Sequence, residues 1–168
     1  MTAPSKEIHP FIAYLQSLAE KQERGALATL RRGLGHSPGA APEMFRYVIP
    51  WLGENPGRSQ EAAYYLLASL FGLHPATASE GNMGTHLALT RSEGGEDALE
   101  RRFTVLLAAH QDDLPVYLRQ AVSFLKSKEK PVNWNQLFHD LQKWDHPDRF
   151  VQKQWARAFW SRIPSSNS

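Results

Sequence analysis

The sequence of 168 residues contains no cysteine, which excludes disulfide bonds, thiolate metal ligands and cysteine nucleophiles. It has no apolar run of about 18 residues that could cross a bilayer. The first residues, MTAPSKEIHPFIAYLQ, lack the basic region and apolar core of a secretory signal peptide. The formal net charge is only +2, which by itself does not indicate a nucleic-acid-binding protein. We therefore expect a cytoplasmic protein with no membrane partner.

Sequence motifs of common enzyme classes are also missing. There is no GxSxG elbow, Walker loop, HExxH pair or GxGxxG loop after a strand. His139 and His146 are seven residues apart, but Pro147 predicts a turn at the second of them, so they do not form a metal-ligand pair. The composition and motifs therefore predict no catalytic residue, no metal site, no cofactor and no small-molecule substrate.

Two smaller features have a structural and a functional interpretation. The neighbouring acids Asp112 and Asp113 lie at a predicted helix start, where the helix dipole favours negative charge. The segment GNMG, residues 81–84, has the spacing of a nucleotide-clamping GxxG loop, but no strand pattern surrounds it. We interpret the acids as helix caps and the GNMG segment as a turn.

The apolar residues recur at helical spacing through most of the chain. A first helix is predicted from Ile8, and a second ends at Gly33 or Gly35 in a left-handed conformation. A third runs from Pro42 to Pro50, and Ser59 caps a fourth.

The second half predicts helices as regularly. Glu96 and Asp97 begin one helix and Asp113 caps the next. Asn133 and Gln136 resemble a capping box, and Pro147 opens the last helix. A short apolar piece around Leu87 and Leu89 lies between glycine-rich loops.

No segment alternates with period two, so the predicted fold class is all-α with about eight to nine helices. The glycine-rich stretch from Thr77 to Gly95 predicts a boundary between two small helical bundles packed in series. We expect an N-terminal bundle at residues 1–95 and a C-terminal bundle at residues 96–168. The tryptophans, four of which lie from Trp134 onward, are interpreted as core, with the burial of Trp160 left open.

Paired arginines are the most informative polar feature. Arg31 and Arg32 end the second predicted helix, where a cation can stabilise the negative end of the helix dipole or contact a phosphate. Arg101 and Arg102 lie in the first half of a later helix, where the dipole disfavours cations. An anionic partner would compensate this cost, and either a phosphate or a carboxylate such as Glu100 could supply it.

Six segments, taken in order, resemble the CasB family, the small subunit of the type I-E CRISPR surveillance complex Cascade. They are GALATLRRGLG, LLASLFGLHP, GNMGTHLALT, ALERRFTVLLA, VYLRQAVSFLKSKEKPVNWNQLFHDLQKW and VQKQWARAFW. Each segment is weakly specific, and the resemblance rests on their ordered succession from about Phe11 to Trp160.

The resemblance implies an all-α protein of two bundles without catalytic activity that acts in antiviral defence. It implies that two copies assemble with CasC-type backbone subunits and the large subunit, and that a basic surface binds crRNA and target DNA in the R-loop. The positions that match the family's basic residues are Arg31, Arg32, Arg58, Arg101, Arg102 and Arg119, and Lys126 extends the face of Arg119. A second-rank basic cluster, facing either nucleic acid or protein, comprises Lys143, Arg149, Lys153 and Arg157.

Two other function classes stay open at this point. A helical scaffold would bridge protein subunits, with its arginines bound to partner carboxylates. A hydrolase would use Asp112, Asp113 and a histidine, which the missing catalytic motifs disfavour.

Overall fold

The computed structural model describes residues 7–92 and 95–161, and within them every extended regular element is a helix. The all-α prediction is confirmed, with nine α-helices and three short 3-10 helices in these residues. An isolated parallel bridge joins Thr77 to Val132. None of the described helices is long and apolar enough to span a bilayer.

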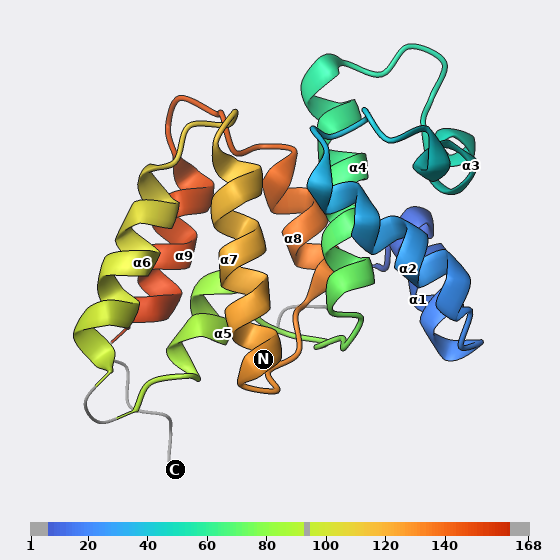
Figure 1. Cartoon of the computed structure of the whole chain (residues 1–168). Coiled ribbons are helices and arrows are strands. Elements are labelled where there is room, and N and C mark those ends of the chain that lie inside the picture. Colours follow the sequence, from blue (N-terminus) through green and yellow to red (C-terminus); the bar gives the residue numbers. More distant parts are fainter. Residues whose placement is uncertain (1–6, 93–94, 162–168) are drawn as a thin grey trace.

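The first helices form one side of the molecule in Figure 1. Their bounds are α1 Pro10–Glu20, α2 Arg24–Arg32, η1 Gly33–Gly35, η2 Pro42–Met44, α3 Phe45–Val48, η3 Ile49–Trp51 and α4 Arg58–Leu73. Helix α4 is buried along most of its length and packs against both α2 and α8.

The later helices form the other side in Figure 1, with α6 and α7 next to each other. Their bounds are α5 Met83–Ala88, α6 Glu96–Ala108, α7 Leu114–Ser127, α8 Trp134–Leu141 and α9 Phe150–Trp160. Helix α5 packs closely on α9, and the buried apolar side chains of both sides form one cluster. The domain boundary at residue 95 stays a prediction.

Two glycines permit close approaches between helices. A Cβ at Gly72 of α4 would lie 2.7 Å from both Arg31 N and Leu27 O of α2. A Cβ at Gly84 of α5 would collide with Trp155 O of α9. The GNMG segment therefore combines a turn at Gly81, whose φ is +87°, with the contact surface of a short helix.

Helix starts were predicted with mixed success. Asn133 Oδ1 accepts the N–H of Gln136 at 3.1 Å, so Asn133 caps α8, and α6 begins at Glu96 as expected. The predicted capping box is incomplete, because the Gln136 side chain donates to Asp140 Oδ1 and the Asn133 N–H donates to His86 Nε2. Helix α4 is preceded by Gly57, so Ser59 lies inside its first turn rather than at its cap. Pro147 does not open α9, which begins three residues later.

Other predictions were wrong at glycine and proline positions. Ile8 precedes α1 and is exposed, because the helix starts at Pro10. Gly33 has φ −60°, so it continues into η1 instead of turning left-handed. A Cβ at Gly33 would collide with Met44 Sδ, so glycine is needed here because there is no room for a side chain. Between Pro42 and Pro50 the predicted helix breaks into η2, α3 and η3, since the two prolines leave fewer than three turns.

The late tryptophans are mostly core, as predicted. Trp134, Trp144 and Trp155 are buried, and the Trp155 indole N–H donates to Asp140 Oδ2 at 2.8 Å. Trp160 is 40% exposed and donates its indole N–H to Glu100 Oε1 at 2.6 Å. Glu100 is thus held by an indole and not by a neighbouring arginine.

Candidate nucleic-acid interface

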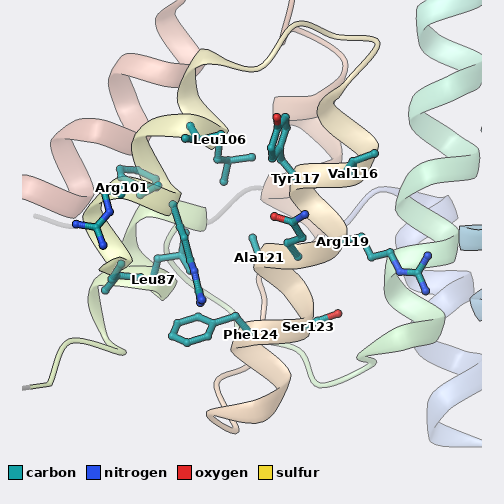
Figure 2. A pocket seen from close by; sticks show the side chains of 14 residues that line it. Leu87, Arg101, Leu106, Val116, Tyr117, Arg119, Ala121, Ser123 and Phe124 are labelled. Carbon is teal, nitrogen blue, oxygen red and sulfur yellow. The ribbon is translucent and has the colours of Figure 1, made fainter. Parts of the chain in front are cut away.

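A groove of about 770 Å³ runs between α6 and α7, and α5 contributes to its floor. Its apolar lining comes from Leu87 of α5, from residues between Leu99 and Leu106 of α6, and from residues between Val116 and Phe124 of α7. Figure 2 shows Leu106 directed across the groove toward Tyr117, with Leu87 near Phe124 at the other end. This groove contains several of the predicted site residues.

Three of the predicted arginines line this groove. Arg101 lies on the outer side of α6, and Arg119 projects from α7 toward α4 (Figure 2). Arg102 also lines the groove, with its Cζ 5.7 Å from the centroid of the Phe124 ring. The groove is therefore flanked by guanidinium groups on both sides, and none of its lining residues is acidic.

These arginines have no carboxylate partner in the part of the chain that the structure describes. The only Lys or Arg there within 4 Å of a carboxylate is Arg91, whose Nε lies 3.0 Å from Glu96 Oε1. Arg119 Nη1 donates to Leu34 O at 3.3 Å, and this bond leaves its charge unneutralised. Asp97 and Glu100 line a neighbouring hollow with Arg101, and Asp112 lines one with Arg119, but none of these acids forms an ion pair with them in the described residues. An exposed guanidinium that is not ion-paired keeps its capacity for an external anion.

Two smaller hollows continue from the groove along the wall formed by α7. One of about 310 Å³ shares Val116 and Arg119 with the groove and reaches the glycines of η1. The next, of about 550 Å³, shares Asp112 and Pro115 with it and reaches Arg58 at the start of α4. Arg58 is thus placed at the far end of a furrow that begins at the α6–α7 groove.

The other predicted residues of the main set lie outside this furrow. Arg31 and Arg32 are exposed in the last turn of α2, and Arg32 Nη2 donates to Thr29 Oγ1 at 3.2 Å. Lys126 is exposed in the last turn of α7 and does not line any of the three hollows. All three occupy C-terminal turns, where the helix dipole stabilises a cation without any ligand.

The four residues of the second-rank cluster differ in whether they bond to the rest of the fold. Arg149 donates from Nη2 to Leu107 O at 2.6 Å and has a left-handed backbone, with φ 53°. Lys153 and Arg157 are exposed one turn apart on α9, and Lys143 is exposed after α8. Arg149 therefore links two elements of the fold, whereas the other three project into solvent.

Two cations that lie over aromatic rings were not predicted from the sequence. Lys128 Nζ lies 5.6 Å from the centroid of the Phe124 ring, the same ring that Arg102 approaches. Arg91 stacks 4.2 Å from the Phe159 centroid and donates to Phe159 O. The KSKEK run at residues 126–130 could have indicated Lys128, whereas no sequence pattern indicates the role of Arg91.

The site offers anion binding by guanidinium groups and stacking on aromatic rings rather than acid–base chemistry. His86 is buried in α5 next to Leu87, which lines the groove, and its Nε2 accepts the N–H of Asn133 at 3.0 Å. Burial lowers the pKa of His86 to about 4, so the ring is neutral near pH 7. No group of three or more His, Cys, Asp or Glu residues in the described chain could hold a metal ion.

Comparison with known proteins places the chain in a family. Residues 26–160 match the family described as CRISPR-associated protein Cse2. The CRISPR-associated protein Cse2 of Thermus thermophilus is 35% identical over 152 residues, which are 89% of this chain and 88% of that protein.

Solved structures share the fold. The crystal structure of CasB from Thermus thermophilus superimposes with a TM-score of 0.79 at 32% identity and covers 89% of this chain and 95% of that chain. A chain of a CRISPR RNA-guided surveillance complex has a TM-score of 0.72 at 24% identity over 89% of this chain and 92% of that chain. The arrangement of helices around the α6–α7 groove thus belongs to a known fold, and the resemblance to CasB is confirmed. The chain is a member of the CRISPR-associated Cse2 family.

Proposed function

We propose that this chain is a non-catalytic small subunit of a type I-E Cascade complex and binds the nucleic-acid backbone of the crRNA-guided R-loop. The observation that carries the binding role is the α6–α7 groove, where Arg101, Arg102 and Arg119 lie without a carboxylate partner in the described residues. Family membership and the likeness to a surveillance-complex chain support the assembly role. Backbone contacts suffice because base pairing with the guide supplies sequence recognition.

The residues differ in the part we assign to them. Arg101, Arg102 and Arg119 are the principal phosphate contacts, and Arg58 extends them along the furrow. Arg31, Arg32 and Lys126 are peripheral contacts at helix ends.

Protein partners are proposed from a separate surface. Phe45 and Ile49 are exposed apolar side chains of α3 and η3, on the side of the molecule away from α6 and α7 (Figure 1). Phe45 and Ile49 are four residues apart in consecutive short helices, and neighbouring exposed apolar side chains are more frequent at protein interfaces than single ones. We assign this surface and the second-rank lysines and arginines to Cascade subunits: the CasC-type backbone, the large subunit or a second copy of the chain.

The test compares two double charge reversals of equal net charge. Arg101→Glu with Arg119→Glu changes the groove, and Lys153→Glu with Arg157→Glu changes exposed positions of α9. Affinity for labelled single-stranded and double-stranded DNA is measured across a salt series. We expect the groove variant to lose at least about tenfold in affinity and the slope for single strands to fall by about 0.7 per lost contact.

The control decides how the result is interpreted. We expect the α9 variant to retain its affinity within about threefold, since Lys153 and Arg157 line neither the groove nor the two hollows that continue from it. Equal losses in both variants would indicate a general charge effect and contradict the assignment. Retained DNA binding with failed assembly of the groove variant would instead support the scaffold hypothesis, provided that circular dichroism shows both variants folded.

A further inference from the structure

The α6–α7 groove contains more apolar surface than phosphate binding requires. Its floor is formed by four buried side chains: Leu87, Leu99, Phe103 and Leu106. At its mouth Val105 is 46% exposed and Val116 is 58% exposed. Apolar side chains gathered in a concave surface are typical of a site that buries part of a ligand.

Polar groups in the groove are free to recognise that ligand. The Tyr117 hydroxyl and the Gln120 side-chain amide line the groove and make no hydrogen bond with the described residues. A glutamine amide both donates and accepts, and so matches the hydrogen-bonding edges of bases. No lining residue carries a negative charge.

Aromatic and guanidinium planes lie together at one end of the groove. The half-buried Phe124 ring has Arg102 Cζ at 5.7 Å and Lys128 Nζ at 5.6 Å from its centroid. Tyr117 provides a second half-buried ring at the other end (Figure 2). Unpaired bases stack on aromatic rings and on arginine planes.

The size of the groove restricts its occupant. Its lining extends from Leu99 to Leu106 on α6 and from Val116 to Phe124 on α7, which corresponds to about 10 and 12 Å along the helix axes. This length is about two helical turns, too short for a typical amphipathic helix of three to four turns. The volume of about 770 Å³ instead lies in the range of pockets that enclose small molecules.

We propose, as an extension of the proposed function on which it rests, that the α6–α7 groove receives an unstacked base of the bound single strand. The strand crosses the groove from the Arg101 side to the Arg119 side, and these guanidinium groups contact backbone phosphates further along the strand on the two sides of the inserted base. A base has a planar ring that fits the apolar floor of the groove. The phosphates of the strand on either side of that base carry the negative charge that the arginines can bind. The groove then adds base stacking to backbone binding without reading the sequence.

The test uses two single strands with the same number of phosphates. One is oligo-dT, and the other is an abasic strand of equal length. We expect the folded full chain to bind oligo-dT about tenfold more tightly than the abasic strand, with the same salt slope, because stacking does not release counterions. A uracil-bearing RNA strand is measured beside them, and the tighter of the two base-bearing strands identifies the strand that inserts its base.

Variants locate the base preference in the groove. Val105→Ser with Val116→Ser removes apolar surface at the mouth and keeps every charge, and Ile49→Ser is the control, since Ile49 is 50% exposed on another surface. We expect the first variant to reduce the tenfold preference to about twofold with an unchanged salt slope and the control to retain it. Photocrosslinking of a 5-iodouracil strand should attach to the peptide that contains Tyr117 and Phe124.

Two outcomes separate this inference from the function on which it rests. Equal affinity for oligo-dT and the abasic strand, with a normal salt slope, would overturn base insertion and leave backbone binding intact. No binding of either strand at low salt would overturn both. Tighter binding of an acidic amphipathic peptide than of oligo-dT would assign the groove to a protein segment and also overturn the inference.

Discussion

Helices α2 and α4 form a closed pair, whereas α6 and α7 form an open one. At the first contact Gly72 lets the backbones approach so closely that a Cβ would lie 2.7 Å from two main-chain atoms of α2. At the second, α6 and α7 leave a groove of about 770 Å³ between them. Both pairs belong to one protein with one connected apolar core, so the difference is local to each contact.

The side chains at each contact explain the difference. In the open pair Phe103 and Tyr117 are large side chains that line the groove, and α5 supports its floor through Leu87. Residues of this size keep the helix axes apart, while a glycine allows close packing. The closed pair therefore contributes stability, and the open pair keeps apolar surface available for a ligand.

The largest expected effect comes from enlarging a residue in the closed pair. Gly72→Val places a branched side chain against Arg31 N and Leu27 O, which cannot move without shifting α2. We expect the free energy of unfolding to fall by about 3 kcal/mol or more, since overpacking in a closed contact is strongly destabilising. Urea denaturation followed by circular dichroism measures the loss.

A second glycine of the closed pair, Gly25 in α2, is the matched control. A Cβ at Gly25 would have no atom within 4 Å, and the φ of this residue is not left-handed. Gly25→Ala should therefore raise the free energy of unfolding by up to about 1 kcal/mol, because alanine is the better helix former. Similar behaviour of the two variants would contradict the proposed role of the close contact.

The next prediction concerns His86 of α5 and the dependence of the free energy of unfolding on pH. The pKa of His86 is lowered by burial from 6.5 to about 4, so the folded protein stays unprotonated there while the unfolded chain binds a proton below about pH 6.5. The unfolded state then binds more protons, and the free energy of unfolding should decrease as the pH falls from 6.5 to 4, by up to about 3 kcal/mol. Denaturation at pH 7 and near pH 4.5 measures most of this decrease.

His86→Gln gives the control for this titration. Its amide oxygen can still accept the N–H of Asn133, but the side chain does not titrate. Burial also lowers the pKa of His9, and that contribution stays the same in both proteins. An equally steep pH dependence in the variant would show that His86 is not the titrating group.

The smallest expected stability change comes from filling the open pair. Figure 2 shows Ala121 on the groove side of α7, so Ala121→Leu extends into empty space. We expect the free energy of unfolding to change by less than about 1 kcal/mol, because no neighbour must move. Denaturation and oligo-dT binding are measured on the same sample, and stacking affinity should fall as the groove fills. A loss as large as that of Gly72→Val would contradict the contrast between the two pairs.

The sequence predicted the helical class because apolar spacing reports which face of a helix is buried. It located α6 and the cap of α8, where Glu96 and Asn133 occupy positions with local chemical preferences. It failed at Gly33, since the need for glycine there arises from Met44, a residue distant from the helix end. Close approaches between elements have no local pattern in the chain.

The sequence predicted only part of the candidate site, because contacts between helices have no local pattern in the chain. Charge and helix position singled out Arg101 and Arg102, and the structure brings both to one groove with Arg119. Sequence alone did not show that Arg149 binds Leu107 O or that Glu100 accepts from Trp160. These contacts join residues from different helices, so the availability of each charge depends on tertiary packing.

The ring contact between Phe103 and Trp160 has a spectroscopic consequence. Phe103 lines the groove, and its ring centroid lies 5.2 Å from that of Trp160. Trp160 is exposed, whereas Trp134, Trp144 and Trp155 are buried and Trp51 is partly buried. Acrylamide should therefore quench the emission of Trp160 in preference to that of the buried tryptophans. The chain thus carries its own fluorescent reporter against the wall of the groove, and occupancy can be followed without a label.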